Sequence, residues 1–160
     1  MKKSILASLL VVTLLFTFGC KKDEPETSTG MTAKVAGSAW KADVTTCAYS
    51  QTMNVTQITG MKGMMAESIQ LNLFGKTTGT YTITDSQTSA IGGYILNATA
   101  EGFYSTLSAD VHSGQIVITE YDQTNKTVSG TFQFEAYNLN EAKISITEGK
   151  FTKVALLVTQ

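Results

Sequence analysis

Apolar side chains recur at every second position along much of this chain after residue 30. The stretch 68–74 (SIQLNLF) has aliphatic residues at alternate positions, and 127–136 (TVSGTFQFEA) places valine, two phenylalanines and alanine on one side. Successive side chains of a β-strand point to opposite faces, so this period predicts strands with one dry and one wet face. No sustained 3.6-residue apolar period follows residue 30. The pattern therefore favours an all-β fold.

The same alternation predicts further short strands at 33–35, 40–44, 55–58, 81–83, 94–96, 116–118 and 142–146. Turn residues lie at 75–79, 91–93, 113–114 and 122–126, and a short helical turn is expected at most near 87–90. We expect a single antiparallel β-sandwich or barrel-like domain of eight to ten short strands, and periodicity does not separate the two architectures. The apolar residues just before Glu148 have even numbers, and the next one after Gly149 has an odd number. This switch predicts a bulge or turn at Glu148 and Gly149.

The first twenty residues differ in character from the rest. Met1, Lys2 and Lys3 precede an apolar run over 5–18, which ends in Gly19 and Cys20. This order is typical of a secretory signal peptide, and the run is shorter than a membrane-spanning helix of about twenty residues. The sequence TFGC at 17–20 resembles the lipobox of a bacterial lipoprotein precursor, whose cysteine carries the lipid. The resemblance implies that Cys20 is the lipid-attachment residue, where several acyl chains such as palmitate would anchor the protein stably.

Residues 21–30 have the composition of a disordered spacer, because they are small or charged and contain the only proline of the chain. We therefore divide the chain into a signal peptide (1–19), a lipidated cysteine with its tether (20–30) and an all-β domain (31–160). The acidic residues after Cys20 resemble the surface-export signal of some Bacteroidota-type lipoproteins. The expected location is the cell envelope, as an outer-membrane lipoprotein that faces the periplasm or the cell surface.

Four short motifs in the domain combine small residues, turns and aromatic residues. They are MTAKVAGSAWKA at 31–42, GTY at 79–81, VSGTFQF at 128–134 and ITEGKF at 146–151. Together they resemble an uncharacterised family of small Bacteroidota-type lipoproteins with an all-β domain of unknown function. The resemblance implies an envelope protein with this fold, and it implies no particular activity.

The charges of the chain argue against nucleic acid as a partner. Twelve basic residues, all of them lysine, stand against 13 acidic residues. Nucleic-acid binding requires a basic patch and commonly uses arginine, which is absent from this sequence. The chain also lacks the residue that most often clamps phosphate or carboxylate groups.

Few residues suggest a metal site. Asp110 and His112 would share one face of a strand at a spacing that suits two metal ligands, but no second histidine or nearby thiol completes the set. The loop with Asp122 and Asn125 lacks the further oxygen ligands of a calcium loop. We therefore expect no metal and no cofactor.

Two kinds of catalytic group remain. Pairs of carboxylates, Glu120 with Asp122 or Glu101 with Asp110, could provide the acid and nucleophile of a glycosidase. Cys47 could act as a nucleophile only with a base such as His112 within reach. With Cys20 lipidated, Cys47 lacks a disulfide partner, and its parity places it on the wet face of its strand. We expect a free, non-catalytic thiol and assign no catalytic residue.

Methionines gather at 61–65 (MKGMM), with Met53 upstream. Thioethers can bind cuprous ion, and they also line adaptable contact surfaces or fill loops.

These features predict a tethered envelope lipoprotein and favour a binding or accessory module over an enzyme. The N-terminal lipid would anchor the protein to the membrane. The ligand would be a carbohydrate, a small apolar molecule or an envelope protein, bound by loops at one end of the sheets. The alternatives are a small glycan-acting hydrolase that uses paired carboxylates and a structural subunit of an outer-membrane assembly.

Overall fold

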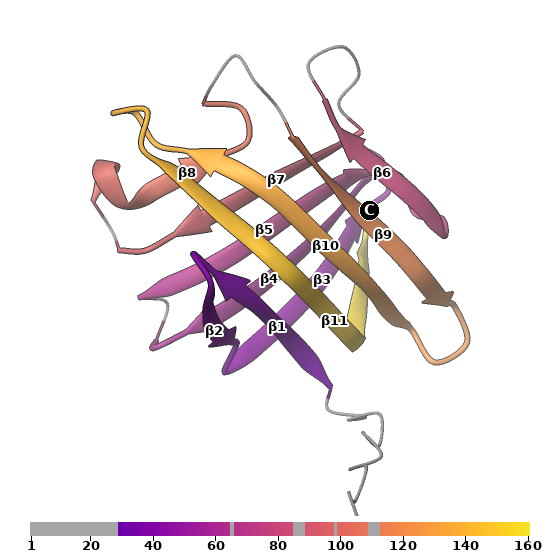
Figure 1. Cartoon of the computed structure of the whole chain (residues 1–160). Helices are drawn as coiled ribbons and strands as arrows, with labels where there is room; N and C mark the ends of the chain where they lie inside the picture. Colours follow the sequence, from indigo (N-terminus) through magenta and orange to yellow (C-terminus); the bar gives the residue numbers. More distant parts are fainter. Residues whose placement is uncertain (1–28, 65, 85–88, 98, 109–112) are drawn as a thin grey trace, which may run out of the picture.

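Eleven β-strands dominate the computed structural model of the chain (Figure 1). The structure describes residues 29–64, 66–84, 89–97, 99–108 and 113–160. The elements are β1 Gly30–Val35, β2 Ser38–Lys41, β3 Val44–Ser50, β4 Val55–Lys62, β5 Glu67–Phe74, β6 Gly79–Ile83, β7 Ala90–Ile95, the 3-10 turn η1 Ala100–Gly102, β8 Phe103–Ser105, β9 Ser113–Asp122, β10 Thr127–Tyr137 and β11 Lys143–Thr159. No helix in these ranges has the length and hydrophobicity of a membrane span.

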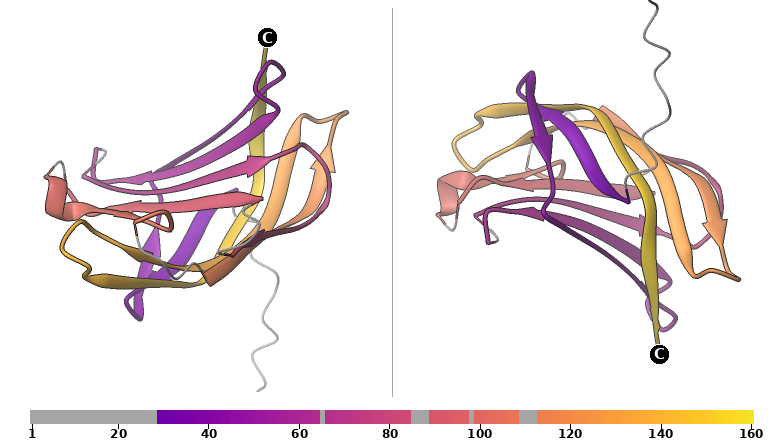
Figure 2. Two further views of the ribbon diagram at one scale, coloured as in Figure 1. Left: turned by 90° about the horizontal axis from the view of Figure 1, so that it is seen from above. Right: turned by 90° about the horizontal axis from the view of Figure 1, so that it is seen from below.

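All eleven strands belong to one sheet, in the order β2-β1-β11-β3-β4-β5-β7-β8-β10-β9-β6. An additional pairing of β10 with β11 closes the central strands into a ring, because β10 also pairs with β8 at Tyr137 and Ser105. The sheet thus folds onto itself as two layers. Figure 2 shows β3, β4, β5 and β7 in one layer and β1, β10 and β11 in the other. The all-β, sandwich-like or barrel-like prediction is confirmed.

Strand β11 connects the two layers. Its first part pairs antiparallel with β1 and β10, and its residues 156–159 pair parallel with residues 47–50 of β3. Figure 2 shows β11 passing from one layer to the other. Because one strand takes part in both layers, its side chains must change direction along its length.

Two β-bulges in β11 accomplish this change. Between the partners of Phe132 and Phe134, β11 has two residues, Thr147 and Glu148, opposite one residue of β10. A second bulge places Thr152 and Lys153 opposite Ser129. Glu148 and Lys153 both have left-handed backbone, with φ of 50° and 47°. The predicted bulge near Glu148 is confirmed, and the two bulges together keep five buried β11 residues on the core side: Ile146, Gly149, Phe151, Val154 and Leu156.

The core lies between the layers and consists mainly of aliphatic and aromatic side chains from all the long strands. Two glycines of β10 and β11 lie opposite phenylalanines, in the pairs Gly130 with Phe151 and Phe132 with Gly149. The rings of Phe132 and Phe151 stack with centroids 6.3 Å apart. Glycine leaves room for the ring on the facing strand, which explains the glycine and aromatic content of the motifs at 128–134 and 146–151.

The nine predicted strand segments each coincide wholly or partly with an observed strand, and two strands were missed. One is β8, whose three residues are too short to display a period. The other is β3, because residues 40–44 are not one strand. The chain turns at Ala42 and Asp43, between β2 and β3. The turns predicted at 91–93 and 113–114 are also wrong, since these residues lie inside β7 and at the start of β9. The helical turn expected near 87–90 falls mainly outside the described residues, and Ala90 begins β7.

Candidate functional site

A pocket of about 180 Å³ opens at the end of the fold where β3, β9 and β11 come together. We call it the end pocket. Its lining consists of tyrosine, glutamine, lysine and aliphatic side chains from four segments distant in sequence: Tyr49 and Gln51, Lys76, Tyr121 with Gln123 and Lys126, and Leu156 with Val158. Tyr49 and Leu156 also belong to the hydrophobic core, so the floor of the pocket is continuous with that core.

Two bulges turn the necessary side chains into the end pocket. In β9 the buried residues Ile116 and Ile118 are followed by an extra residue, Thr119, at a register shift against β10. The shift brings Tyr121 onto the same face as Ile118, although their numbers differ in parity. The second bulge of β11 does the same for Leu156.

Hydrogen bonds fix the segments that carry the lining residues. The backbone N–H of Leu156 donates to the carbonyl of Lys126 at 2.8 Å, which joins the β9–β10 hairpin to the end of β11. The hydroxyl of Tyr49 donates to Oδ1 of Asn54 at 3.0 Å. The Thr56 hydroxyl donates to the carbonyl of Gly75 at 2.6 Å and holds the loop that leads to Lys76.

The end pocket is rich in hydrogen-bond donors and positive charge. The Nζ atom of Lys76 lies 5.1 Å from the centroid of the Tyr49 ring, within the range of a cation–π contact. Burial raises the pKa of the Tyr121 phenol, Cys47 and Tyr49 raise it further, and a hydrogen bond with Thr56 lowers it. Tyr121 therefore stays protonated at neutral pH. Among the described residues, no carboxylate lines this pocket.

Other hollows of the surface lie over the strands and have mixed polar and apolar linings. One of them, a groove of about 240 Å³ over β9, β10 and β11, is lined by residues such as Gln133, Glu135 and Thr147. Its one charged group, Glu135, forms an ion pair with Lys143 at 3.0 Å. The end pocket is the better candidate, because it is more enclosed than these hollows and combines an apolar floor with polar side chains from four segments.

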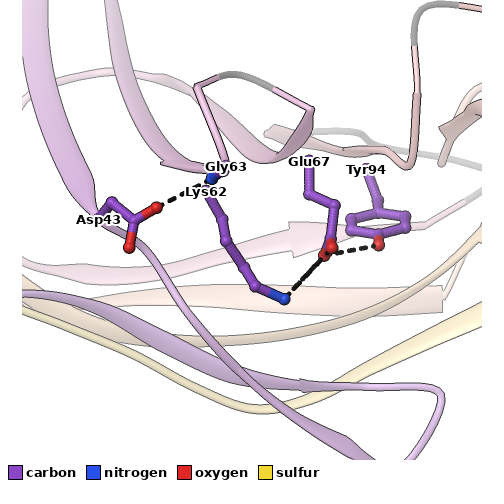
Figure 3. A network of polar contacts seen from close by, with 5 residues as sticks. All are labelled: Asp43, Lys62, Gly63, Glu67 and Tyr94. Atoms are coloured by element: carbon purple, nitrogen blue, oxygen red, sulfur yellow. Dashed lines mark hydrogen bonds and ion pairs between the residues drawn. The ribbon is translucent and has the colours of Figure 1, made fainter.

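A polar network marks the hairpin between β4 and β5 (Figure 3). Lys62 and Glu67 are directly paired residues of the two strands, and their side chains form an ion pair at 3.2 Å. The Tyr94 hydroxyl donates to Glu67 at 3.3 Å, and the Gly63 N–H donates to Asp43 at 2.9 Å. Burial, followed by the charge of Glu67, raises the pKa of Tyr94 to about 12. The network ties the hairpin to β7 and to the turn between β2 and β3, and each of its charged groups already has a partner.

Of the two carboxylate pairs considered from sequence, the structure describes one, Glu120 with Asp122. Glu120 accepts a hydrogen bond from the Ser129 hydroxyl at 3.2 Å, across the β9–β10 ladder. Asp122 accepts the backbone N–H groups of Thr124 and Asn125, and these contacts, led by Asn125, lower its pKa. The Asp122 side chain thus shapes the hairpin. Glu101 lies exposed in η1, and its proposed partner Asp110 lies outside the described residues, as does His112. The described residues contain no cluster of three or more potential His, Cys, Asp or Glu metal ligands.

Cys47 lies in the core, so its predicted place on the wet face is wrong. Its residue is 3% exposed, and the turn between β2 and β3 resets the alternation on which the prediction depended. Cys47 is a free thiol, as expected. Burial raises its pKa to about 12, which makes it a poor nucleophile at neutral pH.

The methionines do not form one group. Met53 lies in the turn before β4, whereas Met61 and Met64 lie at the opposite end of that strand, about 20 Å or more away for its eight residues. Met65 lies outside the described residues, and so does Cys20.

Sequence reasoning missed the residues of the end pocket. Lys76 and Lys126 stand in segments that were recognised as turns, but a turn lysine is too common to indicate a site. Tyr121 and Leu156 follow bulges, so alternation assigns them to the wrong face. The sequence did contain one signal of these bulges: the apolar residues of one strand switch between even-numbered and odd-numbered positions.

The family comparison gives one result. A model for the family "Domain of unknown function (DUF6252)" matches residues 27–155. Leu156 and Val158 of the end pocket lie just beyond this range. No curated protein and no solved structure matches the chain.

Proposed function

The chain belongs to the DUF6252 family, and from this premise we propose that it is a cell-envelope lipoprotein whose β domain binds a small ligand without chemical turnover. The observation that carries the proposal is the end pocket, which combines an apolar floor with polar groups at its rim. Binding sites commonly have this composition, because apolar contact supplies affinity and a few polar groups fix orientation.

The size of the end pocket favours a small ligand or the terminal group of a larger one. An apolar cavity of about 150 Å³ accommodates benzene, and the end pocket measures about 180 Å³. This volume is below the roughly 300 Å³ at which pockets for drug-sized molecules begin. The ligand is therefore about the size of a single ring, as in a sugar unit or an aromatic compound.

The lipoprotein part of the proposal depends on Cys20 and the residues around it. An apolar run of signal-peptide length precedes Cys20, and a polar stretch separates it from β1, which begins at Gly30. A short tether of this kind would hold the domain close to a membrane while leaving the end pocket in water.

The absence of turnover is supported by how the described nucleophiles and carboxylates are used. The Cys47 thiol is buried, and Asp122 and Glu120 are bonded within their own hairpin. Carboxylates that serve as glycosidase acid and nucleophile must instead converge on an open cleft.

A pair of tryptophan variants tests the end pocket directly. Val158 lines the pocket, and Leu157 is its neighbour on the opposite face of β11; both side chains are exposed, at 46% and 64%. In the full chain with Cys20→Ser, we expect Val158→Trp to fill the pocket and Leu157→Trp to leave it open. Ligand-observed NMR with simple sugars and ring-sized aromatic compounds should detect a ligand for the parent and for Leu157→Trp, and its binding should weaken at least about tenfold in Val158→Trp.

Equal binding by both tryptophan variants would place the ligand elsewhere. Conversion of a glycan during the same experiment would show an enzyme, and it would contradict the proposal of binding without turnover.

A further inference from the structure

We propose that the end pocket selects ligands that carry a negatively charged carboxylate on a ring-sized body. This inference rests on the proposed binding function and adds the chemical class of the ligand. It follows from the charges around the pocket, the way in which its lysines are held, and the absence of a competing carboxylate in its described lining.

Two lysines, Lys76 and Lys126, line one small pocket. Neither lysine forms an ion pair with another described residue, although Lys34, Lys62 and Lys143 all do. Two unpaired like charges that share a pocket repel each other, and an anion between them removes this repulsion. Their attraction for one carboxylate is on the order of 1 kcal/mol each at 4 Å in water and larger at a partly dry site.

Asp122, the carboxylate residue closest in sequence to Lys126, points away from the end pocket. Residues 121 and 123 line the end pocket, so the alternation of β9 directs Asp122 to the other face. Its oxygens accept the N–H groups of Thr124 and Asn125 and the side-chain amide of Asn125, at 2.6 to 2.9 Å. Asp122 therefore stabilises the turn that carries Lys126 without neutralising it from inside the pocket.

Both lysines extend from fixed backbone. Lys126 has left-handed backbone in the β9–β10 hairpin, and its carbonyl accepts the N–H of Leu156. Lys76 lies against the Tyr49 ring, and its loop is held by Thr56 at Gly75. An ammonium group over an aromatic face loses less freedom when an anion binds, because the stem is already placed.

The remaining lining residues suit the rest of such a ligand. Leu156 and Val158 offer apolar contact to a ring, and Tyr121 lines the same pocket. Two classes of compound carry a carboxylate on a ring: aromatic acids and acidic sugars. Lysine binds carboxylates as a point charge and without the paired geometry of arginine, so we expect modest, salt-dependent affinity.

The experiment compares acids with their uncharged amides. Binding of benzoate, benzamide, glucuronate and glucuronamide to the full Cys20→Ser chain is measured by NMR titration at low salt. At least one acid should bind about tenfold more tightly than its amide, and the preference should shrink at high salt, where charges are screened within about 3 Å. The benzoate and glucuronate arms distinguish an aromatic acid from an acidic sugar.

Lysine-to-methionine variants test whether the two lysines cause the preference for acids. Methionine removes the positive charge but keeps an unbranched apolar side chain. We expect Lys76→Met and Lys126→Met each to lower the affinity for the acid about threefold to tenfold, and the double variant to bind acid and amide alike. Lys41→Met is the matched control: Lys41 is an exposed residue of β2 outside the pocket lining, so this variant removes the same charge and should bind as the parent does.

The possible failures are distinct. If amides bind as tightly as acids in the parent chain, charge selection is refuted while the proposed binding function stands. Should Lys41→Met weaken the acid as much as the pocket variants do, the attraction comes from overall charge, and the inference is wrong. If neither these four compounds nor any sugar or aromatic compound of the Val158→Trp test binds, the proposed function fails as well.

Discussion

At the scale of single residues, Cys47 shows how the fold controls reactivity. Its thiol is a core group on β3, and its raised pKa of about 12 keeps it neutral. We expect iodoacetamide to leave Cys47 unmodified in the folded protein at pH 8 and to alkylate it after unfolding in urea, as mass spectrometry would show. Rapid alkylation of the folded protein would mean that β3 opens easily at this point.

The same residue predicts a dependence of stability on alkaline pH. The thiol pKa is 9.0 as a reference for the unfolded chain and about 12 when folded. Below pH 9 both states hold the proton, so the full stability is present. Between pH 9 and 12 only the unfolded chain releases it, and the free energy of unfolding falls by up to about 1.4 kcal/mol per pH unit.

Urea unfolding at pH 8 and at pH 10.5 measures this effect. Cys47→Ala should cost about 1 kcal/mol at pH 8 through lost packing, and it should lose less further stability than the parent at pH 10.5. Tyr94, whose pKa is also raised to about 12, contributes above pH 10 in both proteins. Identical losses in the two proteins would exclude Cys47 as a source of the pH dependence.

At the scale of the elements, facing glycine and phenylalanine residues determine how closely β10 and β11 approach. A Cβ at Gly149 would lie 2.5 Å from the Phe132 ring and 2.6 Å from its backbone oxygen. The backbone atom cannot move aside, so Gly149→Ala should lower the free energy of unfolding by about 1–3 kcal/mol. Gly93→Ala in β7 is the control, because its new Cβ would meet nothing nearer than 3.5 Å. Chemical denaturation of both variants should separate them clearly.

The strands themselves could be predicted because most of them have a clean alternation. In β5, Ile69, Leu71 and Leu73 are all fully buried, as their spacing indicates. The end pocket could not be predicted in this way. Tyr121 is separated from Ile118 by an extra residue, and Leu156 from Phe151 by another. A bulge depends on the register of the neighbouring strand, and one sequence does not reveal that register.

At the scale of the whole molecule, residues 1–28 decide where the protein acts in the proposed function. Replacing Cys20 by serine removes the thiol that would carry the lipid, and we expect the protein to move from the membrane fraction to the soluble fraction. Val44→Ser, a change at an exposed residue of the domain, is a control that should stay with the membrane. Cell fractionation followed by a high-salt wash measures both. Retention of Cys20→Ser after the wash would contradict the lipoprotein proposal.

The position of β11 also has a consequence for the time course of folding. This strand pairs with β1, β3 and β10. The first and third strands of the domain already pair with β2 and β4, but they receive their second partner only when the last strand has been synthesised. Such sequence-distant contacts slow folding to milliseconds or seconds in domains of this type. Until then β1 and β3 have exposed edges, and the end pocket has neither Leu156 nor Val158. A partly synthesised chain therefore has exposed strand edges and an incomplete end pocket. The addition of β11 to the sheet removes both defects at once.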